Sequence, residues 1–321
     1  MKLYAPKYYT EFCCIADRCR HSCCIGWEID VDERTLKTYR SLGGYGETVR
    51  GSICTDGDAP HFALCKGDRC PHLTDRGLCS IILYCGEEYL CDICREHPRF
   101  YHGTSRGLEV GLGMSCEEAA RLILSTPWRG EMTDLGQTEE GWTHPFDADA
   151  FRKEFFGILF DEARPYGERL ARIYKAYGIS PAQDTDAQWR ARIAELEYLD
   201  PAHRALFSVY SSVPGECEAY ADVLERALAY LVFRHCAEVY DEGELSLSLG
   251  FCLFCERLLA SLLLASGGSF EDAVECARIL SEELEYSEDN TEAIKACFLS
   301  RKGMALGRCF KMQKGGIQDG A

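Results

Sequence analysis

Cysteine is the residue type in this sequence whose spacing most clearly points to chemistry. The chain has 321 residues and 20 cysteines, and thirteen of those cysteines fall within residues 1–116. Four of them stand close together in the chain, at Cys14, Cys19, Cys23 and Cys24. A thiolate is a soft ligand that suits iron–sulfur clusters and zinc. Four thiols in one short segment therefore indicate a metal or cluster site.

A second set of cysteines lies further along the same region and is spaced more widely. Cys70 and Cys79 are followed by Cys91, Cys94 and Cys116. The gaps in this set are longer than those of a zinc finger, and the short Cys91 and Cys94 pair carries little information by itself. The sequence therefore favours a site assembled from distant segments over a single finger-like zinc site.

Three histidines stand beside these cysteines, at His21, His72 and His97. Each could replace a thiolate as a ligand or donate a hydrogen bond to one. An ordinary core or solvent-facing histidine is the favoured interpretation of each. Cys252 and Cys255 lie in an apolar helical stretch, where core packing is favoured over metal binding.

The N-terminal sequence contains no apolar run of signal-peptide length and no cleavage site of small residues. We therefore expect a cytoplasmic protein, in which thiols stay reduced and dense cysteines are metal ligands more often than disulfides. A disulfide-built protein is the alternative. The most apolar later stretch, residues 245–266, contains Glu256 and Arg257, so we expect a buried helix and no membrane span.

Composition and charge narrow the possible functions. Hydrophobic residues make up 46% of the chain and charged residues 27%, which is ordinary for a globular protein. The formal net charge is −17, which argues against a nucleic-acid partner because that binding needs a basic surface. Residues 1–116 carry 14 basic and 16 acidic side chains, whereas residues 117–321 carry 21 and 36. Two regions of different chemistry are the simplest interpretation.

Short helices joined by irregular loops are expected to position the cysteines. One helix is predicted to run to about Tyr39 after Asp32, which caps it, with Thr35 as the third residue beyond the cap. A second helix is predicted over residues 87–95 and ends before Pro98.

A third helix in this region is predicted over residues 115–125. Ser115 is expected to cap it, and Glu118 to complete a capping box. Such short elements cannot assemble a large continuous core. Ligation of a metal or cluster would supply the missing folding free energy.

A polar segment with several glycines and prolines, residues 126–146, is predicted to divide the chain. Beyond it, apolar residues recur every three or four positions and predict six to eight helices and no strands. The clearest segments are 151–160, 170–177, 220–239, 247–264, 273–284 and 293–310. The predicted fold class is mainly α. It combines a cysteine-rich, irregular metal- or cluster-binding module (1–128), an all-α helical domain (145–312) and a disordered tail (313–321).

Several familiar catalytic motifs are absent. The radical S-adenosylmethionine pattern, C-x3-C-x2-C, begins at Cys19 and Cys23 but has Gly26 in its third place. The glycine-rich dinucleotide fingerprint, the P-loop, the zinc-protease motif and the serine-hydrolase elbow are not found either. The cysteines are therefore the main chemical signal.

The order of the motifs resembles the flagellin lysine-N-methylase family. That family is related to a wider group of cysteine-rich domains described as zinc- or iron-chelating and of the CxxCxxCC type. The resemblance covers about residues 4–125. The segments that carry it are 12–14, 19–27, 29–30, 70–73, 77–81, 86–87, 94–99, Ser115 and Cys116.

The resemblance implies a ligand set, two cofactors and a substrate. It places the family's cysteines on Cys14, Cys19, Cys23, Cys24, Cys70, Cys79, Cys94 and Cys116. It leaves outside that pattern Cys13, Cys54, Cys65, Cys85 and Cys91. It implies methyl transfer from S-adenosylmethionine to lysine side chains of flagellin, with an iron–sulfur cluster. We expect a [4Fe–4S] cluster, with zinc as the alternative, because eight thiolates exceed what one tetrahedral zinc takes.

Three further side chains could contact a cofactor. Trp27 could stack on an adenine or a substrate chain, although core packing is favoured. Arg95 and Arg99 could offset the charge of a thiolate-bound cluster or bind a cofactor carboxylate, with ordinary surface salt bridges as an equal alternative.

The methylation hypothesis has one rival from another class. Methylating an amine needs a neutral lysine, so the site must desolvate the lysine or supply a base, and the sequence identifies no such base. A non-enzymatic metal- or iron–sulfur-binding protein with a redox-sensing or metal-handling role is the alternative. Binding of S-adenosylmethionine distinguishes the two, because a metal-handling protein has no reason to bind it.

Overall fold

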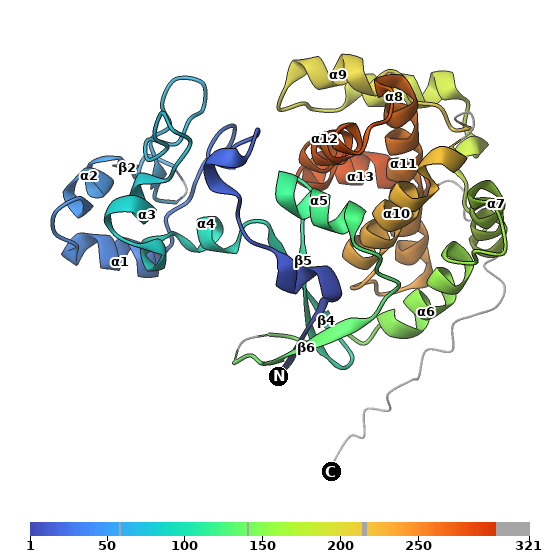
Figure 1. Cartoon of the computed structure of the whole chain (residues 1–321), viewed down its shortest axis with the longest axis horizontal. Coiled ribbons are helices and arrows are strands. Elements are labelled where there is room, and N and C mark those ends of the chain that lie inside the picture. The colour runs from blue at the N-terminus through green and yellow to red at the C-terminus, as the bar shows by residue number, and fades with distance from the viewer. Residues whose placement is uncertain (58, 140, 214–216, 300–321) are drawn as a thin grey trace, which may run out of the picture. The chain divides into compact units, whose positions relative to one another are not determined.

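The computed structural model describes residues 1–57, 59–139, 141–213 and 217–299. The chain forms two compact units, and each is assembled from separate segments. The cysteine unit comprises residues 11–100 and 112–122, and the sheet–helix unit comprises residues 1–10, 101–111 and those from 123 onward. Figure 1 shows both units with their element labels.

Short elements build the cysteine unit, as predicted. They are η2 (Ala16–Arg18), α1 (Glu33–Ser41), α2 (Gly46–Gly51), β2 (Ile53–Cys54), β3 (His61–Phe62), α3 (Ser80–Tyr84), η3 (Glu87–Tyr89), α4 (Asp92–Glu96) and the first part of α5 (Glu117–Ser125), and η1 (Lys7–Glu11) leads into them. Helix α1 begins where the sequence predicts. The Asp32 carboxylate accepts a hydrogen bond of 2.8 Å from the backbone N–H of Thr35.

Two helix predictions in this unit are wrong in detail. The helix expected over residues 87–95 is broken into η3 and α4, because Leu90 and Cys91 leave helical backbone angles between them. Helix α5 begins at Glu117, and the buried hydroxyl of Ser115 has no hydrogen-bond partner among the described residues. The predicted capping box of Ser115 and Glu118 is therefore not formed.

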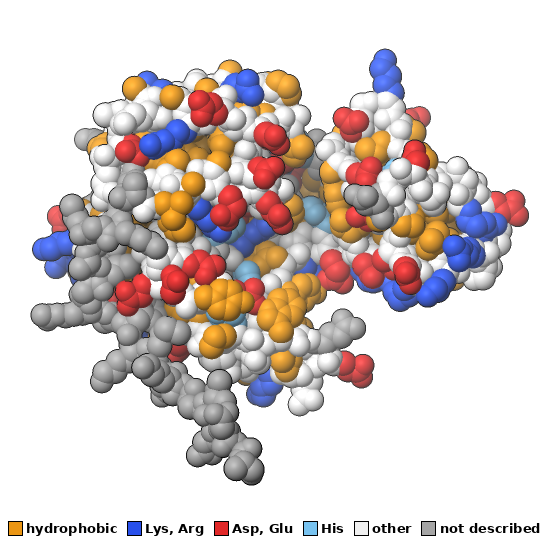
Figure 2. All heavy atoms as spheres, turned by 180° about the vertical axis from the view of Figure 1, so that it is seen from behind, with side chains coloured by type: hydrophobic (Ala, Val, Ile, Leu, Met, Phe, Trp, Pro, Cys, Tyr) orange, Lys and Arg blue, Asp and Glu red, His pale blue; other side chains and the backbone are white. Residues whose placement is uncertain are grey.

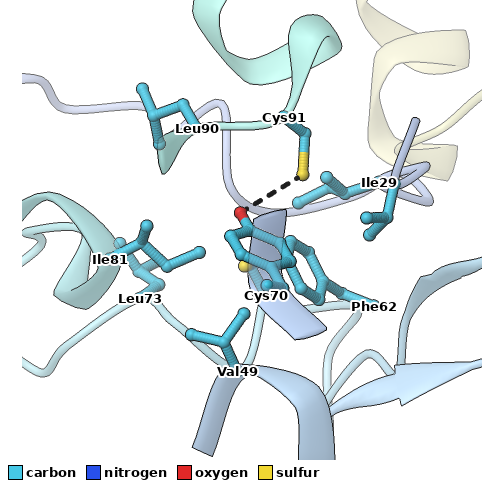
Figure 3. Close-up of a cluster of buried hydrophobic side chains, with 10 residues drawn as sticks. Ile29, Val49, Phe62, Cys70, Leu73, Ile81, Leu90 and Cys91 are labelled. Atoms are coloured by element: carbon cyan, nitrogen blue, oxygen red, sulfur yellow. Dashed lines mark hydrogen bonds between the residues drawn. The ribbon is translucent and has the colours of Figure 1, made fainter. Parts of the chain in front are cut away.

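An apolar core holds the cysteine unit together. It consists of Ile29, Val31, Tyr39, Val49, Phe62, Leu73, Ile81 and Leu90, together with Cys70 and Cys91. Figure 3 shows the two buried cysteines among these apolar side chains. The cysteines that pack against this core from partly buried positions are Cys24, Cys79, Cys85 and Cys94. The core is therefore unusually rich in sulfur.

The sheet–helix unit contains a four-stranded sheet, which the sequence analysis did not predict. Its strands lie in the order β4 (Arg99–Thr104), β5 (Gly107–Leu112), β1 (Lys2–Pro6) and β6 (Met132–Gln137). Strand β1 runs parallel to β5 and antiparallel to β6. Strand β5 is buried along its whole length, including the charged side chain of Glu109.

This sheet corrects two expectations. The segment 126–146, expected to be a polar connection, contains β6, which pairs with the first strand of the chain. The unit that carries the later helices is therefore not all-α. Glu109 on β5 accepts hydrogen bonds of 2.7 and 2.8 Å from the guanidinium of Arg152 on helix α6 (Ala148–Leu159), which ties the sheet to the helices.

Eight α-helices follow the sheet in the part of the chain up to residue 299. They are α6 (Ala148–Leu159), α7 (Tyr166–Tyr177), α8 (Asp186–Glu195), α9 (Pro201–Phe207), α10 (Ala221–His235), α11 (Glu242–Ser266), α12 (Phe270–Leu280) and α13 (Glu288–Ala296), with short η4 (Pro181–Gln183), η5 (Glu218–Tyr220) and η6 (Ser281–Glu285) between them. The predicted helical character of this region is confirmed. The end of the last predicted helix, 300–310, and the predicted tail, 313–321, lie outside the described residues.

Helix α11 is the longest element and contacts α9, α10, α12 and α13. Figure 1 shows these helices gathered around it. It is long and apolar enough to cross a membrane, yet most of its side chains are buried within the unit. Its Glu256 and Arg257 are also buried, and the Glu256 carboxylate accepts a 2.7 Å hydrogen bond from the Tyr166 hydroxyl. The prediction of a buried helix is confirmed.

The described surface carries charges of both signs. On the face drawn in Figure 2, acidic side chains stand among basic and apolar ones. Many acidic side chains are paired, as in the contacts of Arg164 and Arg172 with Asp161. Local ion pairs therefore neutralise individual acidic side chains on the described surface, although the net charge of the chain is unchanged.

Candidate metal centre

The first thiol group consists of Cys14, Cys19, Cys23 and Cys116, which come from two distant parts of the cysteine unit. Cys14 and Cys19 flank the short η2 helix, and Cys116 immediately precedes α5. Burial raises the pKa of the Cys19 thiol to about 11, and Glu117 and Cys116 contribute to the rise. Burial also raises the pKa of Cys116, and nearby Cys14 adds to it. The four thiols thus lie close enough to influence one another.

The backbone of this group is strained at one position. Ala16 has a φ of +52°, in the left-handed region that an alanine rarely adopts. Its N–H donates to the Cys14 sulfur at 3.4 Å, which helps to hold this conformation. Strain of this kind costs of order 1–3 kcal/mol and persists where surrounding contacts over-determine it.

An ion pair joins the two parts of the first thiol group. The Glu117 carboxylate accepts hydrogen bonds from the backbone N–H of Arg20 at 2.8 Å and from its guanidinium at 2.9 Å. Burial opposes ionisation of Glu117, but these hydrogen bonds hold its pKa below the ordinary value. The Cys19 thiol lies 3.6 Å from the same carboxylate. Glu117 was not singled out from the sequence, and it fixes the loop of Cys19 to the start of α5.

The second thiol group consists of Cys24, Cys70, Cys79, Cys91 and Cys94. The backbone N–H of Cys70 donates to the carbonyl of Cys24 at 2.8 Å. Cys79 directly precedes α3, Cys91 directly precedes α4, and Cys94 lies within α4. Burial raises the pKa of Cys70 to about 12, and Cys24, Cys79 and Cys91 add to the rise. Two members of this group, Cys70 and Cys91, belong to the core shown in Figure 3, and the other three pack against it.

Cys91 is the member of this group that the family resemblance left outside its ligand set. A hydrogen bond between the Cys91 and Cys94 thiols raises the pKa of Cys94 and lowers that of Cys91. The Cys91 sulfur also lies 3.7 Å from the hydroxyl of Tyr39, the contact marked by the dashed line in Figure 3. The C-x2-C spacing of Cys91 and Cys94 was the one signal that pointed to it.

Adjacent residues link the two groups. The Cys23 thiol hydrogen-bonds to that of Cys24, and this contact, with burial and nearby Cys14 and Cys116, raises the pKa of Cys23. The pKa of Cys24 is lowered to about 7, chiefly by the same hydrogen bond and also by one with Ser22 and by the Arg69 charge. Cys23 thus faces one thiol group while Cys24 faces the other.

Apart from the thiol pairs Cys23–Cys24 and Cys91–Cys94, the sulfurs of the two groups are spread too widely for one mononuclear site. In the described chain, no three of them lie within 4.8 Å of each other. A single tetrahedral zinc with Zn–S distances of about 2.3 Å needs four sulfurs within roughly 3.8 Å of each other. No disulfide joins the described cysteines either, and Cys13 and Cys65 are exposed.

The side chains proposed to contact a cofactor make ordinary structural contacts. The indole N–H of Trp27 donates to the carbonyl of Cys23 at 2.7 Å, across a turn in which Gly26 has a φ of +94°. The guanidinium of Arg95 pairs with Asp92, and that of Arg99 donates to the Arg95 carbonyl at 3.1 Å. None of the three lines the cavity of about 420 Å³ that Arg129, Arg152 and other residues form in the sheet–helix unit.

His72 is a core histidine, as the favoured interpretation expects. It is buried, and its Nε2 lies 2.8 Å from the Ser52 hydroxyl while its Nδ1 lies 3.4 Å from the Tyr45 hydroxyl. Burial lowers its pKa to about 4. Both ring nitrogens therefore have hydroxyl neighbours in the protein.

Comparison with known proteins gives two lysine-N-methylases and a flagellar biosynthetic protein as relatives. The lysine-N-methylase of Salmonella typhimurium (strain LT2) is 29% identical over 136 residues, which cover 38% of this chain and 32% of that protein. The lysine-N-methylase of Salmonella choleraesuis shows the same identity and coverage. The flagellar biosynthetic protein FliU of Salmonella muenchen is 29% identical over 132 residues, which cover 38% of this chain and 76% of that protein.

These relatives confirm the resemblance that the motifs indicate. The match spans about a third of the length of the two lysine-N-methylases. No protein-family model and no solved structure matches the chain.

Proposed function

We propose that this chain acts as a protein lysine N-methyltransferase whose cysteine unit binds an iron–sulfur cluster. Its substrate would be the lysine side chains of flagellin, and its methyl donor S-adenosylmethionine. In the reaction the methyl group moves from the sulfonium sulfur to the lysine Nζ, which loses one proton. The observation that carries the proposal is the convergence of the cysteines into two thiol groups in a chain whose relatives are lysine-N-methylases.

The residues of the two thiol groups fit a metal cluster. One set of cluster ligands would be Cys14, Cys19, Cys23 and Cys116. The other would be Cys24, Cys70, Cys79 and Cys94. Their wide spacing favours a multi-iron cluster over a mononuclear zinc, because each iron of a [4Fe–4S] cluster takes its own thiolate. The raised pKa values of Cys19 and Cys70 also show that burial disfavours bare thiolates at these positions. When bound, a cluster supplies positive charge that stabilises the thiolates and ties distant segments together.

The protein's own groups hold these ligands in place. The Glu117 contacts with Arg20 fix one edge of the first thiol group, and the Asp32 carboxylate accepts a 2.9 Å hydrogen bond from the N–H of Asp92, at the start of α4. Asp32 thereby links α1 to the helix that carries Cys94. These contacts position the cysteine ligands. They do not identify the residues that would bind the substrate lysine.

Metal and sulfide analysis of anaerobically purified full chain tests the metal part of the proposal. We expect iron and sulfide in equal amounts, with a broad absorption band near roughly 400 nm. Cys14→Ser and Cys70→Ser should each lower the iron content at least twofold. Cys65→Ser, which changes an exposed thiol outside both groups, is the matched control and should leave the iron unchanged.

The catalytic part is tested separately, with binding of S-adenosylmethionine and transfer of labelled methyl groups to purified flagellin. Saturable binding and labelled lysine support the proposal. Iron without S-adenosylmethionine binding would instead favour the non-enzymatic metal-binding alternative. Zinc without sulfide would remove the cluster but leave methylation standing, and a metal-free protein with all thiols free would overturn the metal part.

A further inference from the structure

A cluster of potential ligands outside the two thiol groups lies on the β2–β3 hairpin. Cys54 and His61 are direct partners in the antiparallel pairing of these strands. Facing partners in an antiparallel pair have Cβ atoms about 4.5–5.5 Å apart and project to the same face. Asp56 follows in the connecting turn, and the ligand atoms of Cys54, Asp56 and His61 lie within 4.8 Å of one another.

The imidazole of His61 is oriented as a metal ligand requires. Its Nδ1 lies 3.0 Å from the carbonyl oxygen of Ala59. A carbonyl can only accept, so Nδ1 carries the proton and Nε2 is the atom left for other partners. A backbone carbonyl that fixes the tautomer in this way is the usual neighbour of a metal-binding histidine.

Two carboxylates face the other ring nitrogen. His61 Nε2 lies 3.6 Å from Glu28 Oε2 and 3.7 Å from Asp56 Oδ1. Ligands about 2.0–2.3 Å from a tetrahedral zinc are separated from each other by roughly 3.3–3.8 Å. The two measured distances fall in that range. Asp30, which pairs with His61 across an isolated backbone bridge, is the further acidic group nearby.

We propose that the cluster of Cys54, Asp56 and His61 binds one zinc ion, separate from the cysteine groups, and that Glu28, which contacts His61 from outside this cluster, moves in as the fourth ligand. One thiolate, one imidazole and two carboxylates make a mixed, borderline-soft ligand set that suits zinc. Cys54 belongs to none of the motifs that resemble the lysine-N-methylases, and this site gives it a role. The ion would join the loop after Trp27 to both strands of the hairpin, which contain only two residues each. Its role is therefore to fix a segment that has little regular structure of its own.

The alternative without metal is an ion pair. A doubly protonated His61 could sit between the same two carboxylates, and His61 has its pKa raised by the Ala59 hydrogen bond and these charges. That arrangement gives Cys54 no role. The two arrangements therefore differ in whether zinc is retained and in whether sulfur is bound to it.

The test uses the full chain, purified anaerobically, incubated with a small excess of zinc and freed of unbound metal. Zinc and iron are then counted per chain. The wild type should retain one zinc more than His61→Ala and Cys54→Ser, with the iron content equal in all three. Cys65→Ser, an exposed cysteine of the same unit, is the control and should match the wild type.

Two further measurements keep the proposal falsifiable if His61→Ala disturbs folding. Asp56→Asn changes an exposed side chain and should weaken zinc affinity by about tenfold or more. X-ray absorption at the zinc edge should give one sulfur at about 2.3 Å and three lighter ligands at about 2.0–2.2 Å for the zinc that the variants lose. Equal zinc in the wild type and all variants, or a lost zinc with four sulfur ligands, would overturn the proposal.

Discussion

At the scale of single residues, neighbours in the chain have separate tasks. Cys23 and Cys24 are consecutive, yet they face different thiol groups. Cys91 and Cys94 are three residues apart and share one group. The number of thiols in a segment is therefore a poor guide to the number at one site, because the local backbone direction decides which group a thiol joins.

A buried or half-buried carboxylate with several donors makes stability depend on pH. The Glu238 carboxylate accepts hydrogen bonds from the backbone N–H of Gly103 at 2.7 Å and from the Trp142 indole. Although burial opposes ionisation, hydrogen bonds from His102, Trp142 and Gly103 lower its pKa to about 2. Its folded pKa is thus below its unfolded value, so its stabilising contribution is complete above an unfolded pKa of about 4.3 and declines as pH falls toward 2.

We therefore expect Glu238→Gln to be less stable than the wild type at pH 7 and the difference to shrink between pH 5 and 3. Denaturant unfolding at a series of pH values measures it. The control is Glu292→Gln, an exposed side chain whose only described contact is with Lys295. If the loss in free energy of unfolding caused by Glu238→Gln stays constant down to pH 3, the lowered pKa of Glu238 is not its source.

At the scale of elements, close packing limits what the central helix accepts. Helix α11 contains Gly250, and a Cβ built there would lie 2.5 Å from the Phe298 ring. Helix α6 contains Gly157, whose added Cβ would meet nothing within 4 Å. The same substitution therefore has opposite consequences in the two helices.

We expect Gly250→Ala to lower the free energy of unfolding by about 1–3 kcal/mol, because overpacking exceeds the gain in helix propensity. Gly157→Ala is the matched control and should raise it by about 0.5–1 kcal/mol, since alanine is the better helix former. Chemical denaturation of both variants provides the comparison. Stabilisation by Gly250→Ala would mean that the Phe298 ring moves aside.

At the scale of the whole molecule, the two units depend on different sources of stability. The sheet–helix unit buries a 25-residue helix among others. The longest helix that lies wholly in the cysteine unit has nine residues, and its core contains many thiols. Under the proposed metal ligation, the cysteine unit would take more of its folding free energy from the bound metal than the sheet–helix unit does.

Removing the metals that we propose should therefore loosen the cysteine unit and leave the sheet–helix unit unchanged. After anaerobic chelation, we expect amide hydrogen exchange to speed up at least tenfold in residues 11–100 and to stay unchanged in helices α10 and α11. Mass spectrometry of peptides from both units follows the exchange. Equal loosening of both units, or of neither, would contradict separate sources of stability.

The sequence by itself determined the helical part of the fold. Helices α6, α7, α10, α11 and α12 coincide closely with predicted segments, whereas α8 and α9 match none of them and α13 begins earlier than predicted. The Asp32 cap of α1 is where the sequence places it. These features depend on interactions between residues a few positions apart, so local patterns are enough to predict them. The segments that carry the cysteines, and their resemblance to the lysine-N-methylases, were also evident from the sequence.

Only the tertiary structure decided the sheet, the grouping of the thiols and the hairpin cluster. Strand β1 pairs with β5 and β6, which lie more than a hundred residues away, and no local pattern encodes that pairing. Cys116 joins the thiols of Cys14 and Cys23 across a similar separation, and Cys54 meets His61 through strand register. The sheet and the thiol contacts depend on how distant segments pack, because the chain must close a long loop before such side chains can meet, whereas Cys54 and His61 meet through the pairing of two nearby strands.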